Sequence, residues 1–167
     1  MPGINTFDDL FLSHLKDIYY AERQVLKVLP KMVKAAQNPE LKEAFTLHRE
    51  QTQGQIERLQ SVFEMLGKRA AGVKCEAMDG LVEECDELLE EAKEPSAIRD
   101  AGLLASAQAV EHYEMARYGT LIAWAKANGK KDIVALLQQT LDEEKKTDLL
   151  LSQMGQKTIN KAAVAAE

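Results

Sequence analysis

Cysteine, which can cross-link a chain, and proline and glycine, which interrupt helices, are scarce in this sequence of 167 residues. It contains two cysteines, four prolines and nine glycines, and aromatic side chains make up only 5%. Cys75 and Cys85 form neither a Cys-x-x-Cys pair nor a Cys/His cluster with zinc-ligand spacing, so we expect two packing thiols in a reducing cytoplasm. The low content of proline, glycine and aromatic residues favours a helical protein over a disordered or all-β one.

Long apolar runs and a basic surface are also missing. No stretch approaches the roughly 18 apolar residues of a membrane-spanning helix, and the N-terminus lacks the basic and apolar regions of a signal peptide. Lysine and arginine number 21 against 27 aspartates and glutamates, which gives a net charge of −6. Nothing supplies the basic stripe that phosphate binding needs. We therefore expect a cytoplasmic protein that binds neither nucleic acid nor membranes.

Apolar residues recur at helical spacing in four long segments and one short one. The expected long helices cover residues 6–36, 39–66, 96–128 and 131–154, and a shorter amphipathic helix covers residues 76–92. Their ends carry typical signals: Thr6 is a candidate N-cap, Asn38 with Pro39 starts the second long helix, and Gly67 and Gly129 end the second and the third. The short connections within each pair of long helices predict two antiparallel hairpins.

Two tight hairpins joined by a longer connection with a short helix are the layout of a ferritin-like four-helix bundle with one crossover. We therefore expect an all-α protein in which residues 1–167 form a single domain. Pro30 lies inside the first helix and predicts a kink there, or else a break. Gly155 is expected to end the fourth long helix, and the alanine-rich tail, residues 156–167, to fray or to pack on a partner.

Acidic side chains interrupt the apolar faces of three of the long helices. Glu111 lies within the stripe of the third long helix, and Glu114 flanks the same face one turn further along. Glu22 stands at the centre of the first stripe, and the fourth stripe includes Glu144 and Asp148. Burying a carboxylate without a partner costs several kcal/mol, so these acids need a cation, a proton or a metal ion.

The second long helix contributes His48 and Thr52 to its stripe instead of an acid. Folding the two hairpins brings this histidine and four of the acids towards the middle of the bundle: Glu22, His48, Glu111, Glu144 and Asp148. Two metal ions would neutralise the set, and Fe, Mn and Zn all accept carboxylate and imidazole ligands. A bundle without metal, in which the buried acids are protonated, is the alternative.

Five segments together have a recognisable pattern: residues 6–15, 48–58, 75–81, 110–114 and 141–144. They resemble the YciF/YciE stress-protein family, a ferritin-like group similar to the rubrerythrins in its metal layout, and the resemblance covers nearly the whole chain. It implies a homodimer and a centre of two metal ions, with iron foremost. Carried over by position, the similarity to rubrerythrin-type sites implies four ligands: Glu22, Glu111, Glu114 and, as the bridging candidate, Glu144.

Two helices depart from that pattern. The fourth long helix has Thr147 where a rubrerythrin-like Glu-x-x-His motif has histidine, so Asp148 would have to replace it or the position stays open. On the second helix His48 is followed three residues later by Gln51, a weaker ligand candidate because its amide is neutral. Glu50 is an alternative by motif, but its helical phase points it away from the apolar stripe.

The resemblance implies a function in stress defence, in which a carboxylate-bridged centre would oxidise Fe(II) with peroxide or O₂. The alternative is a structural or interaction protein whose metal only stabilises the bundle. The amide at Gln51 and the hydroxyl at Thr147 slightly favour this alternative. His112 lies about 100° from the stripe, so it is not expected among the ligands.

Overall fold

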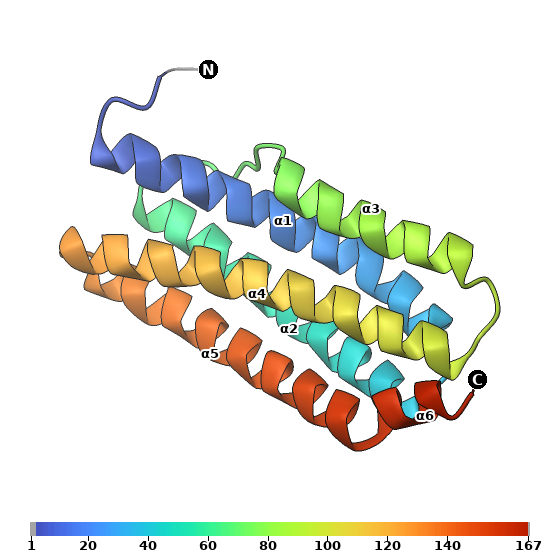
Figure 1. The fold of residues 1–167 in the computed structure, drawn as a ribbon. Coiled ribbons are helices and arrows are strands. Elements are labelled where there is room, and N and C mark those ends of the chain that lie inside the picture. The colour runs from blue at the N-terminus through green and yellow to red at the C-terminus, as the bar shows by residue number, and fades with distance from the viewer. Residues whose placement is uncertain (1–2, 167) are drawn as a thin grey trace.

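Helices account for most of residues 3–166, which are the residues that the computed structural model describes (Figure 1). The elements are α1 (Phe7–Ala35), α2 (Pro39–Met65), α3 (Glu76–Glu91), α4 (Ala97–Ala127), α5 (Lys131–Met154), the π-helical turn η1 (Gly155–Ile159) and α6 (Asn160–Val164). The bounds of α1 to α5 lie within one residue of those expected from the sequence. No strand occurs within the described range.

The four long helices α1, α2, α4 and α5 lie side by side as a bundle (Figure 1). Helices α1 and α2 pack as one antiparallel hairpin and α4 and α5 as another, while α2 contacts α5 and α1 contacts α4. The segment between α2 and α4 carries α3, which packs against α1 and α4. The prediction of an all-α four-helix bundle with one crossover is therefore confirmed.

The helix ends follow the capping signals of the sequence. Thr6 and Asp9 form a reciprocal capping box at the start of α1, and the Asn38 side chain accepts a hydrogen bond from the backbone N–H of Leu41 at the start of α2. Gly67 and Gly129 adopt φ values of 64° and 67°, a region that favours glycine, directly after α2 and α4. Helix α1 continues through Pro30, so the alternative of a break at that residue is wrong.

The expectation of a frayed tail is wrong for residues 156–164. Helix α5 ends at Met154 with Gly155 as its C-cap, as predicted, and the chain then turns and continues as η1 and α6 (Figure 1). The side chain of Ile159 is buried in the core, and both elements pack on α4 of the same chain. A single buried isoleucine among alanines and polar residues is too weak a periodic signal to reveal this docking.

Arg99 and Asp100, at the start of α4, form hydrogen bonds to two of the connections between helices. The buried Asp100 carboxylate accepts hydrogen bonds from the backbone N–H groups of Gln37 and Asn38 at 2.7 and 2.8 Å. The Arg99 guanidinium donates to the carbonyl oxygens of Ala35, Ala92 and Lys93. This pair ties the α1–α2 turn to the end of the crossover.

Replacing Asp100 by alanine is expected to destabilise the protein by about 2 kcal/mol, because two backbone donors in a partly buried turn lose their charged acceptor. Urea unfolding followed by circular dichroism measures this change. Asp132→Ala is the matched control, since Asp132 is an exposed acid in the first turn of α5. Equal stability losses in the two variants would contradict the role of Asp100.

None of the helices within residues 3–166 is both long enough and apolar enough to cross a membrane.

Candidate metal centre

Four glutamates and one histidine from the four long helices are buried in the interior of the bundle. Glu22 comes from α1, His48 from α2, Glu111 and Glu114 from α4, and Glu144 from α5. The four glutamates have no exposed surface, and His48 has 2%. The sequence placed each of them on a face turned towards the core, and the structure confirms this burial.

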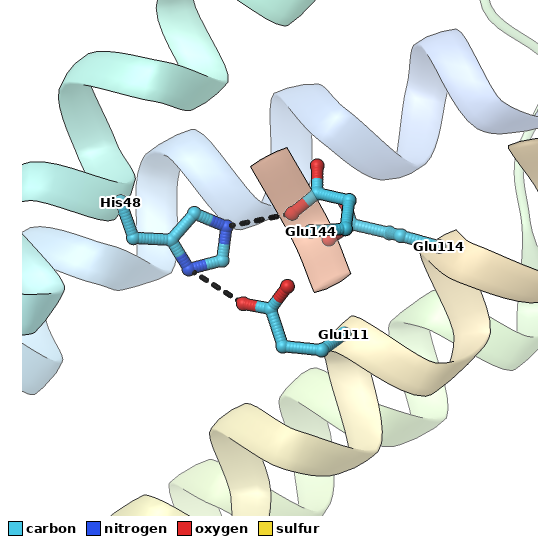
Figure 2. A group of neighbouring side chains, drawn as sticks. All are labelled: His48, Glu111, Glu114 and Glu144. Carbon is cyan, nitrogen blue, oxygen red and sulfur yellow. Dashed lines mark ion pairs between the residues drawn. The ribbon is translucent and has the colours of Figure 1, made fainter. Parts of the chain in front are cut away.

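Four of these side chains converge on one point, as Figure 2 shows. One ligand atom from each of His48, Glu111, Glu114 and Glu144 lies within 4.8 Å of the others. His48 Nδ1 lies 2.9 Å from Glu111 Oε1, and His48 Nε2 lies 3.8 Å from Glu144 Oε2. Neither contact has the geometry of a hydrogen bond. Both contacts count as ion pairs by distance, and they hold the side chains around a shared position (Figure 2).

Glu22 lies beside this group. Its Oε1 accepts a hydrogen bond from the hydroxyl of Tyr118, a fully buried tyrosine on α4, while its Oε2 has no partner. After the larger effect of burial, the negative charge of Glu22 contributes to the raised pKa of Glu114. Glu22 therefore extends the cluster towards α1.

Burial dominates the electrostatics of the cluster. It raises the pKa of Glu22 to about 8, with a further contribution from the charge of Glu144, and it also raises the pKa of Glu111 to about 8. Burial, followed by repulsion from neighbouring carboxylates, raises the pKa of Glu114 and of Glu144 well above the ordinary value. In the absence of a cation, this cluster therefore retains protons at neutral pH.

The donor atoms fit a metal ion. As carboxylates and imidazole, these side chains leave nine buried oxygen and nitrogen atoms without a hydrogen-bond partner in the described part of the chain: Glu22 Oε2 and both donor atoms of His48, Glu111, Glu114 and Glu144. Each unsatisfied buried polar atom costs about 1–3 kcal/mol, so an arrangement of this kind needs compensation. A mixed set of carboxylate oxygens and an imidazole suits Fe, Mn or Zn.

The structure does not bring Asp148 into this group. Asp148 is half-buried, and its Oδ1 lies 3.2 Å from Gln108 Nε2 and 3.1 Å from His112 Nε2. Position 148 is one turn beyond Glu144, where the antiparallel α4 presents these two polar side chains. His112 is exposed, in agreement with its helical phase.

The two departures from the rubrerythrin-like pattern face each other. The Thr147 hydroxyl lies 3.4 Å from Gln51 Oε1 and 3.2 Å from the carbonyl oxygen of Glu143. Thr147 is buried and Gln51 is half-buried. Glu50 is exposed, as its phase predicted.

Two residues at the cluster were not identified from the sequence. Tyr118 on α4 was not among the candidates, yet its hydroxyl donates a hydrogen bond to Glu22. Gln55 on α2 is fully buried: its Nε2 donates to Glu143 at 3.1 Å, and its Oε1 has no partner. A neutral amide beside an apolar stripe is no anomaly in a sequence, but Gln55 follows Glu22 at the same spacing of 33 residues that separates Glu144 from Glu111.

Comparisons with known proteins agree with this architecture. Residues 6–164 match a family model described as a domain of unknown function, DUF892. Protein YciF of Escherichia coli strain K12 is 43% identical over 162 residues, which cover 96% of this chain and 97% of YciF. The crystal structure of that stress protein matches with a TM-score of 0.89 at 42% identity, over 95% of this chain and 99% of the other.

A second solved structure is similarly close. YcfI from Rhodopseudomonas palustris, described as a proposed structural protein, matches with a TM-score of 0.87 at 51% identity. The match covers 90% of this chain and 96% of YcfI. The chain therefore belongs to the DUF892 family, and its predicted resemblance to the YciF/YciE stress proteins is confirmed.

Proposed function

We propose that this protein is a ferritin-like metalloprotein of stress defence that binds two metal ions, iron foremost, inside its four-helix bundle. The observation that carries the proposal is the convergence of His48, Glu111, Glu114 and Glu144 within 4.8 Å, fully buried and without hydrogen-bond partners. Structural ion pairs seldom leave so many buried donor atoms unsatisfied. A metal ion supplies the missing positive charge and takes the free lone pairs.

Side chains from three helices would bind the metal together. Glu144 and Glu111 approach His48 from two helices, so three elements contribute to one position. Tyr118 donates to Glu22 and so fixes the orientation of that carboxylate, as outer hydrogen bonds commonly do at metal centres. Metal binding must displace the protons that the raised pKa values retain, so it releases protons and strengthens as the pH rises.

We further propose that the centre is a redox site at which Fe(II) is oxidised by peroxide or O₂. Bound iron supplies the one-electron chemistry, and the protein contributes position, burial and charge. The cluster contains four carboxylates and one imidazole, which favour the more highly charged oxidised metal. The homodimer that the family resemblance implies stays a prediction.

The second candidate is a structural role, in which the metal only stabilises the bundle. Two observations favour it: the Gln51–Thr147 contact replaces ligands on two helices, and the name of the relative YcfI proposes a structural role for that protein. Both candidates require the same metal position. They differ in whether bound iron reacts.

Iron titration separates the two candidates. Protein purified without chelator is expected to contain Fe, Mn or Zn, and metal-free protein is expected to bind Fe(II) anaerobically. Addition of peroxide or O₂ should then oxidise the iron faster than in protein-free buffer, which absorbance spectroscopy measures. Bound metal with a raised melting temperature but no faster oxidation would favour the structural role. Failure to bind any of the three metals would refute the metal centre.

A further inference from the structure

Gln55 keeps one polar atom unsatisfied inside the bundle. The side chain is fully buried on α2, and its Nε2 donates to Glu143 Oε2 at 3.1 Å. The opposite amide orientation would turn Oε1 towards the Glu143 carboxylate, where two acceptors would repel. Oε1 is therefore held away from Glu143, and it has no hydrogen-bond partner. A buried carbonyl oxygen of this kind costs free energy unless something binds it.

Gln55 lies at the level of the metal-binding side chains along the bundle. Helices α2 and α5 pack against each other, and their side-chain hydrogen bonds pair Gln51 with Thr147, Gln55 with Glu143, and Arg58 with Thr140. Glu144 directly follows Glu143, so Gln55 and Glu144 occupy the same height on facing helices. His48 lies on the same face of α2, about two helical turns away.

The two hairpins place interior polar residues at equal spacing. Gln55 follows Glu22 by 33 residues, and Glu144 follows Glu111 by 33 residues. All four of these side chains are fully buried, and each spacing joins the first helix of a hairpin to the second. Gln55 therefore has the place in the first hairpin that Glu144 has in the second.

From this placement we infer that Gln55 Oε1 is a metal ligand, which together with Glu22 forms the second and weaker of two metal positions. The inference rests on the proposed metal-binding function. The first position has an imidazole and three carboxylates, contributed by His48, Glu111, Glu114 and Glu144. The second position has the neutral amide of Gln55 where the first has the carboxylate of Glu144, and an amide attracts a cation less strongly.

A positive charge also acts on the second position. The Arg58 guanidinium, which forms an ion pair with Glu143, is close enough to Glu22 to favour its charged form. That cation opposes the arrival of a metal ion near Glu22. The centre is thus asymmetric, with one retained metal ion and one that exchanges. Such an exchangeable position suits Fe(II) as a substrate that enters, reacts and leaves.

Cobalt(II) titration of the full-length, metal-free protein tests the inference, with calorimetry for affinity and visible absorption for the ligand environment. The wild-type protein is expected to bind two equivalents with separate affinities. Gln55→Leu removes the oxygen and should weaken the second equivalent by about tenfold or more, while the first is unchanged. Gln55→Glu introduces a carboxylate and should raise the affinity for the second equivalent by a similar factor.

Gln53→Glu is the matched control, because Gln53 lies on the exposed face of the same turn and the substitution adds the same charge. It should change neither equivalent. Wild-type affinity for the second equivalent in Gln55→Glu and Gln55→Leu would overturn the role of Gln55, as would equal tightening of both equivalents in Gln55→Glu. No binding of cobalt(II) by the wild-type protein would instead overturn the proposed metal centre. Gln55→Glu decides the matter if the leucine variant does not fold.

Discussion

Replacing Glu114 by leucine is expected to stabilise the metal-free protein while it weakens metal binding by about 100-fold or more. Glu114 is fully buried, and both its oxygens lack hydrogen-bond donors. Burial raises its pKa, and repulsion from Glu22, Glu144 and Glu111 raises it further. Leucine has a similar volume and no charge, so the substitution removes a cost of about 1–3 kcal/mol from the folded state.

The opposite signs of the two effects make this prediction specific. If Glu114 served only for packing, its replacement would not weaken metal binding. If it supported the fold through an ion pair, its replacement would leave the partner unsatisfied and destabilise the protein. Urea unfolding of chelator-treated protein gives the stability, and cobalt(II) calorimetry gives the affinity. Glu50→Leu is the control, because Glu50 is an exposed acid on α2, and it should change neither quantity beyond about 0.5 kcal/mol. Loss of stability with unchanged metal affinity in Glu114→Leu would contradict the site.

The pH dependence of stability is expected to have an unusual sign in the metal-free protein. The pKa values of Glu22 and Glu111 are about 8 in the folded protein, against 4.5 for an ordinary glutamate. Between these two values the folded state binds more protons than the unfolded state, so stability falls as the pH rises. Each group that stays protonated contributes up to about 1.4 kcal/mol per pH unit. Below pH 4.5 this contribution no longer changes, because both states are protonated.

Metal should reverse this dependence. A bound cation replaces the protons, and the carboxylates become better ligands as the pH rises, so the stabilisation by metal grows across the same range. Urea unfolding at several pH values between 5 and 8, with and without Zn(II), measures both slopes. Zn(II) is chosen because it has no redox chemistry. Glu114→Leu should flatten the slope of the metal-free protein; a wild-type slope near zero or of opposite sign would show that the acids are not buried as described.

The sequence allowed most of the site to be predicted because an acid on an apolar stripe is a local anomaly. Glu22, Glu111, Glu114 and Glu144 each interrupt such a stripe, and all are fully buried in the structure. His48 was assigned by phase as well, and the structure places it against Glu111. Helical phase gives the direction of a side chain around the helix to within about 50°. This is sufficient when only one candidate residue lies on the buried face.

Phase was insufficient where two candidates lay one turn apart. Asp148 and Glu144 are both near the same stripe, but only Glu144 reaches the centre, because Gln108 and His112 of α4 bind Asp148 at the rim. Gln55 shows the converse error. Its amide alone is unremarkable in sequence, and the 33-residue spacing from Glu22 gains meaning only beside its burial and its unsatisfied oxygen.

The helices, their ends and the order in which they pair could be predicted from the amino-acid sequence, since these depend on local spacing, on capping residues such as Thr6 and Asn38, and on short connections. Which polar atoms meet became known from the folded bundle: His48 with Glu111, Tyr118 with Glu22, Gln51 with Thr147. The folded bundle also shows that the last residues dock through Ile159. The physical reason is that metal ligation and hydrogen bonding depend on distances of a few ångströms between helices, whereas a helical pattern fixes only directions within one.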